Sequence, residues 1–177
     1  MSLIGEWRAS RERRQRAERY LEALVAPPDA ADVDWLASLT GDRERAVQEL
    51  GFARRAVGLI VAERDALDDR TASDVAHALT GFLDTEVRHR PLAGAEWASR
   101  WRAYSAALAL RGQVDAPAVR LGRVLLESAG VAHPSAEALD RASQFVGSHR
   151  ARANEALRSA FGVASMPDDV RPSAMRH

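Results

Sequence analysis

Residues that favour helices far outnumber residues that favour strands in this chain. Alanine and leucine together account for 53 of its 177 residues, whereas valine, isoleucine and threonine account for 20. Alanine and leucine stabilise helices, and β-branched residues suit strands. No segment alternates apolar and polar residues between hairpin turns such as Asn-Gly, as a sheet would require. We therefore expect an all-α fold, a single bundle of six or seven helices.

Prolines and glycines mark where the expected helices stop. A proline ring removes a backbone donor, and glycine readily adopts the left-handed conformation that ends a helix. The expected helices cover roughly residues 3–25, 29–40, 42–67, 71–89, 95–111, 115–129 and 135–161. Apolar residues cover more than one side of 42–67, which is therefore the expected central helix. We expect one helical domain over residues 1–162 and a mobile tail over 163–177.

Charge and cysteine content narrow the class of protein. The 25 basic residues, all arginine, are balanced by 25 acidic ones. A neutral total argues against a generic polyanion binder, because non-specific nucleic-acid affinity follows positive charge. The chain has no cysteine, which excludes disulfides, thiolate metal sites and a cysteine nucleophile. The longest apolar run spans seven residues, 56–62, far short of the roughly 20 that cross a bilayer. We expect a cytoplasmic protein with no membrane contact.

Local catalytic motifs are absent from the sequence. It has no Gly-x-Ser-x-Gly elbow, no phosphate-binding glycine loop, no His-Glu-x-x-His and no dinucleotide fingerprint. A site assembled from distant helices leaves no such signature, so enzymatic activity stays open. We favour a non-enzymatic protein and expect no cofactor.

A Glu-x-x-His pair, Glu86 and His89, ends the expected fourth helix. At about 100° per residue both fall on the side that carries Val75 and Leu79, so we expect them to face the core. Carboxylate metal proteins place this pattern on two helices of a bundle, whereas here it occurs once. A metal site at Glu86 and His89 is one interpretation. We favour another, in which His89 complements the helix dipole and Glu86 neutralises an arginine, with Arg150 as the expected buried partner.

The expected fifth helix carries the densest aromatic feature of the chain. Its stripe lies in a segment, 88–111, that holds five arginines and one acidic residue. Such a face could stack unpaired bases, anchor a protein partner, or simply pack in the core with its arginines reaching water. We favour the core, and the other two interpretations stay open. The candidate interface or nucleic-acid residues are Arg88, Arg90, Trp97, Arg100, Trp101, Arg102, Tyr104 and Arg111.

The first helix interleaves six arginines with four glutamates, a net charge of about +2. Pairs such as Glu12 with Arg16 support a solvated helix locally. The stretch 11–16 contains no apolar residue, although Trp7 and Tyr20 lie on either side of it. We favour a solvated helix. The other interpretation is that part of residues 1–26 projects from the body and meets a second chain.

These patterns favour an interaction or adaptor subunit that self-associates or belongs to a larger complex. The leading alternative is a nucleic-acid-binding protein that uses the arginine and tryptophan residues of 88–111. The second alternative is a metal-binding bundle built on Glu86 and His89.

Overall fold

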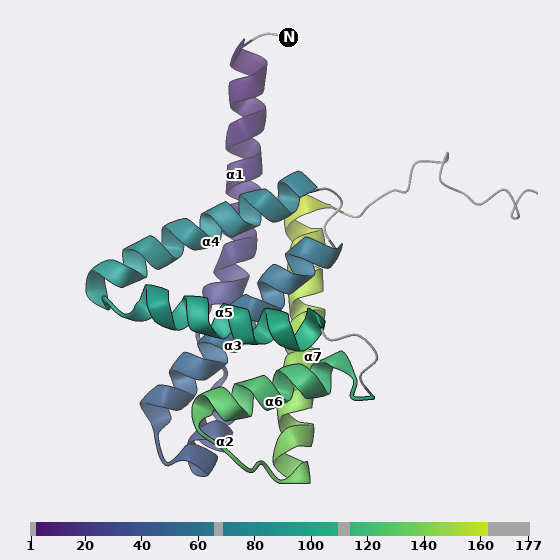
Figure 1. Cartoon of the computed structure of the whole chain (residues 1–177). Helices are drawn as coiled ribbons and strands as arrows, with labels where there is room; N and C mark the ends of the chain where they lie inside the picture. The colour runs from purple at the N-terminus through teal and green to yellow at the C-terminus, as the bar shows by residue number, and fades with distance from the viewer. Residues whose placement is uncertain (1–2, 66–68, 110–113, 163–177) are drawn as a thin grey trace, which may run out of the picture.

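The computed structural model describes residues 3–65, 69–109 and 114–162, and these residues form seven helices and no strand. The all-α prediction is therefore confirmed. The expected tail, residues 163–177, lies outside the described residues. The helices are α1 (Leu3–Val25), α2 (Ala30–Thr40), α3 (Arg43–Asp65), α4 (Asp69–His89), α5 (Ala93–Ala109), α6 (Pro117–Ala129) and α7 (Ala136–Phe161). Figure 1 shows their arrangement.

Local signals set most helix ends. Gly41 and Gly130 end α2 and α6 in the left-handed region, with φ of 71° and 97°, a conformation that costs glycine little. The Ser135 side chain accepts a hydrogen bond from the backbone N–H of Ala138 and so caps α7. The expected fourth helix, 71–89, begins two residues earlier in the structure, at Asp69, and Thr71 is buried within it.

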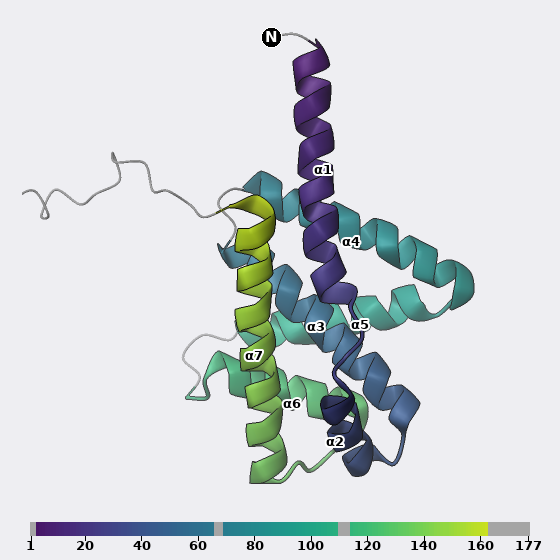
Figure 2. The same ribbon diagram turned by 180° about the vertical axis from the view of Figure 1, so that it is seen from behind.

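Helix α3 is the centre of the molecule, as its apolar pattern predicts. It packs against each of the other six helices. Its buried residues lie on more than one side, so Leu50, Phe52 and Leu59 are all covered. In Figure 2, α1, α2 and α7 lie on the near side of α3, and α4, α5 and α6 lie on the far side.

Two apolar clusters fill the bundle. The first joins α2, the N-terminal half of α3, α6 and the N-terminal half of α7. The second joins α1, the C-terminal half of α3, α4 and the end of α7. Helices α3 and α7 contribute residues to both clusters, so these two helices join one cluster to the other.

Two glycines allow helices to approach closely. A Cβ atom at Gly58 of α3 would lie 2.2 Å from a methyl carbon of Leu24 in α1, and the Tyr20 hydroxyl donates a 2.8 Å hydrogen bond to the Gly58 carbonyl. A Cβ atom at Gly122 of α6 would lie 2.9 Å from the backbone nitrogen of Ser143 in α7. Backbone cannot move aside as a flexible side chain can, so the α6–α7 packing requires glycine at 122.

We predict that Gly122→Ala lowers the free energy of unfolding by about 1 to 3 kcal/mol, because the added methyl group forces α6 and α7 apart. Gly81→Ala is the matched control, since a Cβ atom at Gly81 of α4 meets no atom within 4 Å. That control should gain about 0.5 to 1 kcal/mol from the better helix propensity of alanine. Urea denaturation followed by circular dichroism measures both. Equal effects of the two variants would contradict the close approach at Gly122.

Candidate functional site

The aromatic stripe of α5 lies at the junction of the two apolar clusters. Tyr104 is fully buried, whereas Trp97 and Trp101 are half-buried and pack against both clusters. The two tryptophan rings stack with centroids 5.9 Å apart, and Phe52 of α3 lies 6.4 Å from Trp97. Tyr104 therefore serves as core, and each of the two tryptophans is partly covered by other side chains.

Arg100 extends from the same helix into a buried ion pair. Its Nε atom donates to Glu49 Oε2 over 2.7 Å, and its Nη2 atom donates to Glu49 Oε1 over 2.5 Å. This two-point geometry matches the planar fork of arginine to a carboxylate. The hydrogen bonds to Glu49 raise the pKa of Arg100 above its usual value. Arg100 is thus neutralised inside the protein and is not free to contact a phosphate.

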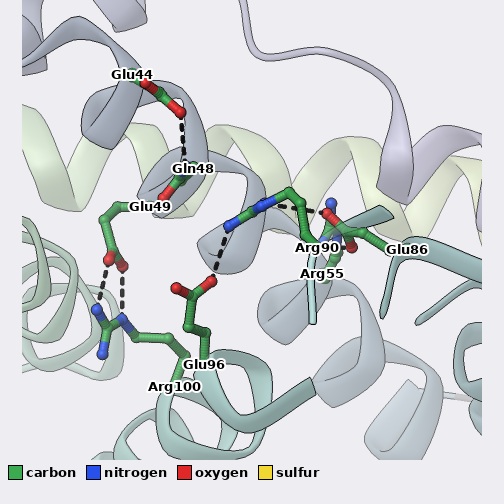
Figure 3. A network of polar contacts seen from close by, with 8 residues as sticks. All are labelled: Glu44, Gln48, Glu49, Arg55, Glu86, Arg90, Glu96 and Arg100. Carbon is green, nitrogen blue, oxygen red and sulfur yellow. Dashed lines mark hydrogen bonds and ion pairs between the residues drawn. The ribbon is translucent and has the colours of Figure 1, made fainter. Parts of the chain in front are cut away.

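Figure 3 shows a second set of ion pairs, which joins α3, α4 and α5. Glu86 of α4 accepts a 3.0 Å hydrogen bond from Arg55 of α3 and a 3.4 Å hydrogen bond from Arg90. Arg90 also donates to Glu96 of α5 over 2.8 Å. The guanidinium of Arg55 lies 5.6 Å from the Phe52 ring and 5.1 Å from the Phe82 ring. Burial lowers the pKa of Arg55, and Glu86 opposes that shift.

The expected pair of Glu86 with Arg150 is replaced by these contacts. Arg150 is exposed on α7 and lines a different part of the surface. Glu86 does neutralise arginines, but they are Arg55 and Arg90. Arg150 lies outside the stripe that α7 buries, which runs through Val146, His149 and Ala153.

Glu86 and His89 have no third metal ligand beside them among the described residues. His89 is exposed, and the α4–α5 turn beside it extends past the rest of the molecule in Figure 1. Glu86 is already engaged by two arginines. Among the described residues, no three histidine, aspartate or glutamate side chains come close enough to hold a metal ion together.

Few of the candidate interface or nucleic-acid residues in segment 88–111 lie outside the contacts described above. Arg88 and Arg102 are exposed, and neither forms an ion pair with another described residue. Arg111 lies outside the described residues. The Tyr104 hydroxyl is buried and has no hydrogen-bond partner in the described part of the chain. Burial also raises the pKa of Tyr104, so this phenol acts as a packing group.

A polar cluster that no sequence pattern predicts ties the α1–α2 turn to α3 and α7. Arg54 of α3 is buried and donates to the carbonyl oxygens of Pro27 and Ala23, over 2.6 and 2.9 Å. Arg152 of α7 pairs with Asp29 at 2.9 Å. Arg54 satisfies carbonyl groups at the C-terminal end of α1, where a helix favours positive charge.

His149 lies buried beside this cluster, with its ring at 4.2 Å from the Phe145 ring. Burial lowers the pKa of His149 from 6.5 to about 4, and the positive charges of Arg54 and Arg152 add to that effect, while Asp29 opposes it. The imidazole is therefore neutral at pH 7. It is a poor candidate for a general base, because its free electron pair is only weakly basic.

The N-terminal end of α1 extends beyond the other helices (Figures 1 and 2). Residues 5–12 are all exposed, and 62% of the surface of Trp7 is accessible. The Arg11 guanidinium lies 5.6 Å from the Trp7 ring. Contact with the body begins at Arg13, which pairs with Asp74 of α4 at 3.6 Å. We refer to residues 5–16 as the α1 arm.

We predict that Arg100→Ala lowers the free energy of unfolding by about 3 kcal/mol, because it leaves the buried Glu49 carboxylate without a partner. Only 4% of the Glu49 side chain is exposed. Arg43→Ala is the matched control, since Arg43 and Asp34 form an ion pair with about 63% of each side chain exposed, and such pairs contribute no more than about 1 kcal/mol. Chemical denaturation of both variants checks the difference. A loss for Arg100→Ala as small as that for Arg43→Ala would contradict it.

His149 should make the protein less stable in mild acid. Its folded pKa lies below its unfolded value, so the unfolded chain binds the proton more readily as the pH falls from 6.5 toward 4. The free energy of unfolding should drop over that range by up to about 3 kcal/mol. His149→Phe should remove this part of the pH profile, whereas His133→Phe, which removes an exposed imidazole, should keep the native profile. Thermal unfolding at a series of pH values is the measurement, and identical profiles for the native protein and His149→Phe would refute the assignment.

No protein-family model, no curated protein and no solved structure matches this chain. Among the described residues, no helix combines the length and the apolar character needed to cross a bilayer. Any inference about function therefore rests on the residues of this protein itself. They bring together a network of internal ion pairs on α3, α4 and α5, and they leave residues 5–12 of the α1 arm exposed.

Proposed function

We propose that this protein is a non-enzymatic interaction subunit that self-associates through the α1 arm. The observation that carries the proposal is the exposure of every residue from 5 to 12 in a helix that continues into the core at Ala17 and Tyr20. A helical segment that packs against nothing is only marginally stable in water. A partner that covers the arm would supply the missing tertiary contacts.

The chemistry of the arm suits a protein interface. Trp7 is its large apolar side chain, and Arg11 lies against the Trp7 ring. Tryptophan and arginine contribute most of the binding energy in many interfaces. The arm carries five arginines and two glutamates, so a partner surface with acidic residues would complement its charge.

The nucleic-acid alternative stays a prediction. Two of its arginines, Arg90 and Arg100, are paired with carboxylates, and its tryptophans are half-buried. These contacts leave Arg88 and Arg102 as its exposed cations among the described residues. The ion pairs and the partial burial of the tryptophans favour a protein interface over nucleic-acid binding.

We expect the native protein to be larger than a monomer by size-exclusion chromatography with light scattering. Trp7→Ala should shift it toward the monomer, because the variant removes the apolar anchor of the arm while the core stays intact. Leu92→Ala is the matched control, since Leu92 is 71% exposed in the turn between α4 and α5. This control should leave the mass unchanged. A native protein that stays monomeric at high concentration would reject self-association.

A further inference from the structure

A small apolar cavity opens on the side of the molecule opposite the α4–α5 turn. The C-terminal ends of α3 and α5 and the N-terminal end of α6 meet α7 there (Figure 1). Its volume is about 120 Å³, and its walls include Val57, Val61, Leu108, Leu121 and Val146. Each of these four helices contributes an apolar side chain, so the cavity is a product of the tertiary fold. It shares no residue with the ion-pair network or the α1 arm.

The charged residues in the described lining of this cavity are all exposed. Arg64 of α3 and Arg150 of α7 line it and are both exposed. Within the described part of the chain neither arginine forms an ion pair, whereas Arg54, Arg55 and Arg100, which are covered, have a carboxylate or carbonyl partner. Asp65 is the single carboxylate among the described residues that line the cavity. These described residues give the rim a net charge of about +1.

The size and the charge of the cavity restrict its ligand. An engineered cavity of about 150 Å³ with apolar walls binds benzene, so about 120 Å³ suits a body of roughly six carbon atoms. Arginine binds carboxylates with two parallel hydrogen bonds. Helix α6 starts at Pro117 on the cavity wall without a side-chain cap, and its positive end adds to the attraction for an anion. Asp65 disfavours a second negative charge on the ligand.

We infer that this cavity binds a small monocarboxylic acid with an apolar body of about six carbon atoms. The body occupies the space between Val61, Leu121 and Val146. The carboxylate lies at the open side, between Arg64 and Arg150. This inference is independent of self-association through the α1 arm.

The first experiment compares acids with alcohols that have the same apolar body. Hexanoate and benzoate are titrated into the full chain, alongside hexanol and benzyl alcohol, by calorimetry and by nuclear magnetic resonance. The acids should bind with a Kd on the order of 1 mM or lower, as expected for ligands of this size. Each acid should bind at least about tenfold more tightly than its alcohol.

Removal of the two arginines tests the assigned carboxylate contacts. The double variant Arg64→Ala/Arg150→Ala should weaken the acids at least about tenfold and leave the alcohols unchanged. Both arginines are exposed, so the fold should persist. Arg88→Ala/Arg102→Ala removes two exposed arginines elsewhere and should change neither affinity.

Gly147 allows the cavity to be blocked without damage to the fold. It lines the cavity on α7, and a Cβ atom there meets no atom within 4 Å. Gly147→Leu should abolish binding of acids and alcohols, while the Tm stays the same or rises, because leucine is the better helix former. Gly81→Leu makes the same change on α4, where a Cβ atom also meets open space. That variant should bind like the native protein.

Three results would overturn the inference. The first is the absence of binding for both acids at millimolar concentrations. The second is equal affinity for acids and alcohols, which would deny the arginines a role. The third is binding that Gly147→Leu leaves unchanged, which would place the ligand elsewhere on the protein.

Discussion

The fold depends on the need to pair the covered charges of its central helix. Helix α3 packs against all six other helices, yet it carries Glu49, Arg54 and Arg55 on covered faces. A charge removed from water is costly unless it is paired and hydrogen-bonded. Each of these residues has a partner on a different element of the fold, although the Nε atom of Arg55 has none among the described residues. The charged positions of α3 therefore add specific contacts with three other elements to its apolar packing.

The same constraint explains why so many arginines are unavailable for binding. Arg54 holds the end of α1, Arg55 holds α4 through Glu86, and Glu49 holds α5 through Arg100. Arginines of α3 and α5 thus hold the fold together. Those that remain exposed include arginines of the α1 arm at one end of the molecule, Arg88 and Arg102 of α4 and α5, and Arg64 and Arg150 beside the cavity.

Local chemistry made the helices predictable from the sequence. The partners of the buried charges were not predictable in the same way. Ser135, Gly41 and Gly130 set helix ends through contacts within a few residues, so the sequence reveals them. The partner of Glu86 depends on packing, because Arg55 lies 31 residues away along the chain. A prediction of which residues face the core, extended over several helical turns, also loses accuracy where the helix extends beyond its neighbours. His89, at the exposed end of α4, shows that loss.

One face of α5 links the ion-pair network to the cavity. Arg100, Tyr104 and Leu108 follow one another at intervals of four residues, so they share a face of the helix. The first binds Glu49, the second fills the core, and the third forms a wall of the cavity. Arg120 of α6 donates a 2.7 Å hydrogen bond to the Ala107 carbonyl, which holds α6 to the end of α5. The position of the cavity wall is thus set by the same helix that the buried ion pair anchors to α3.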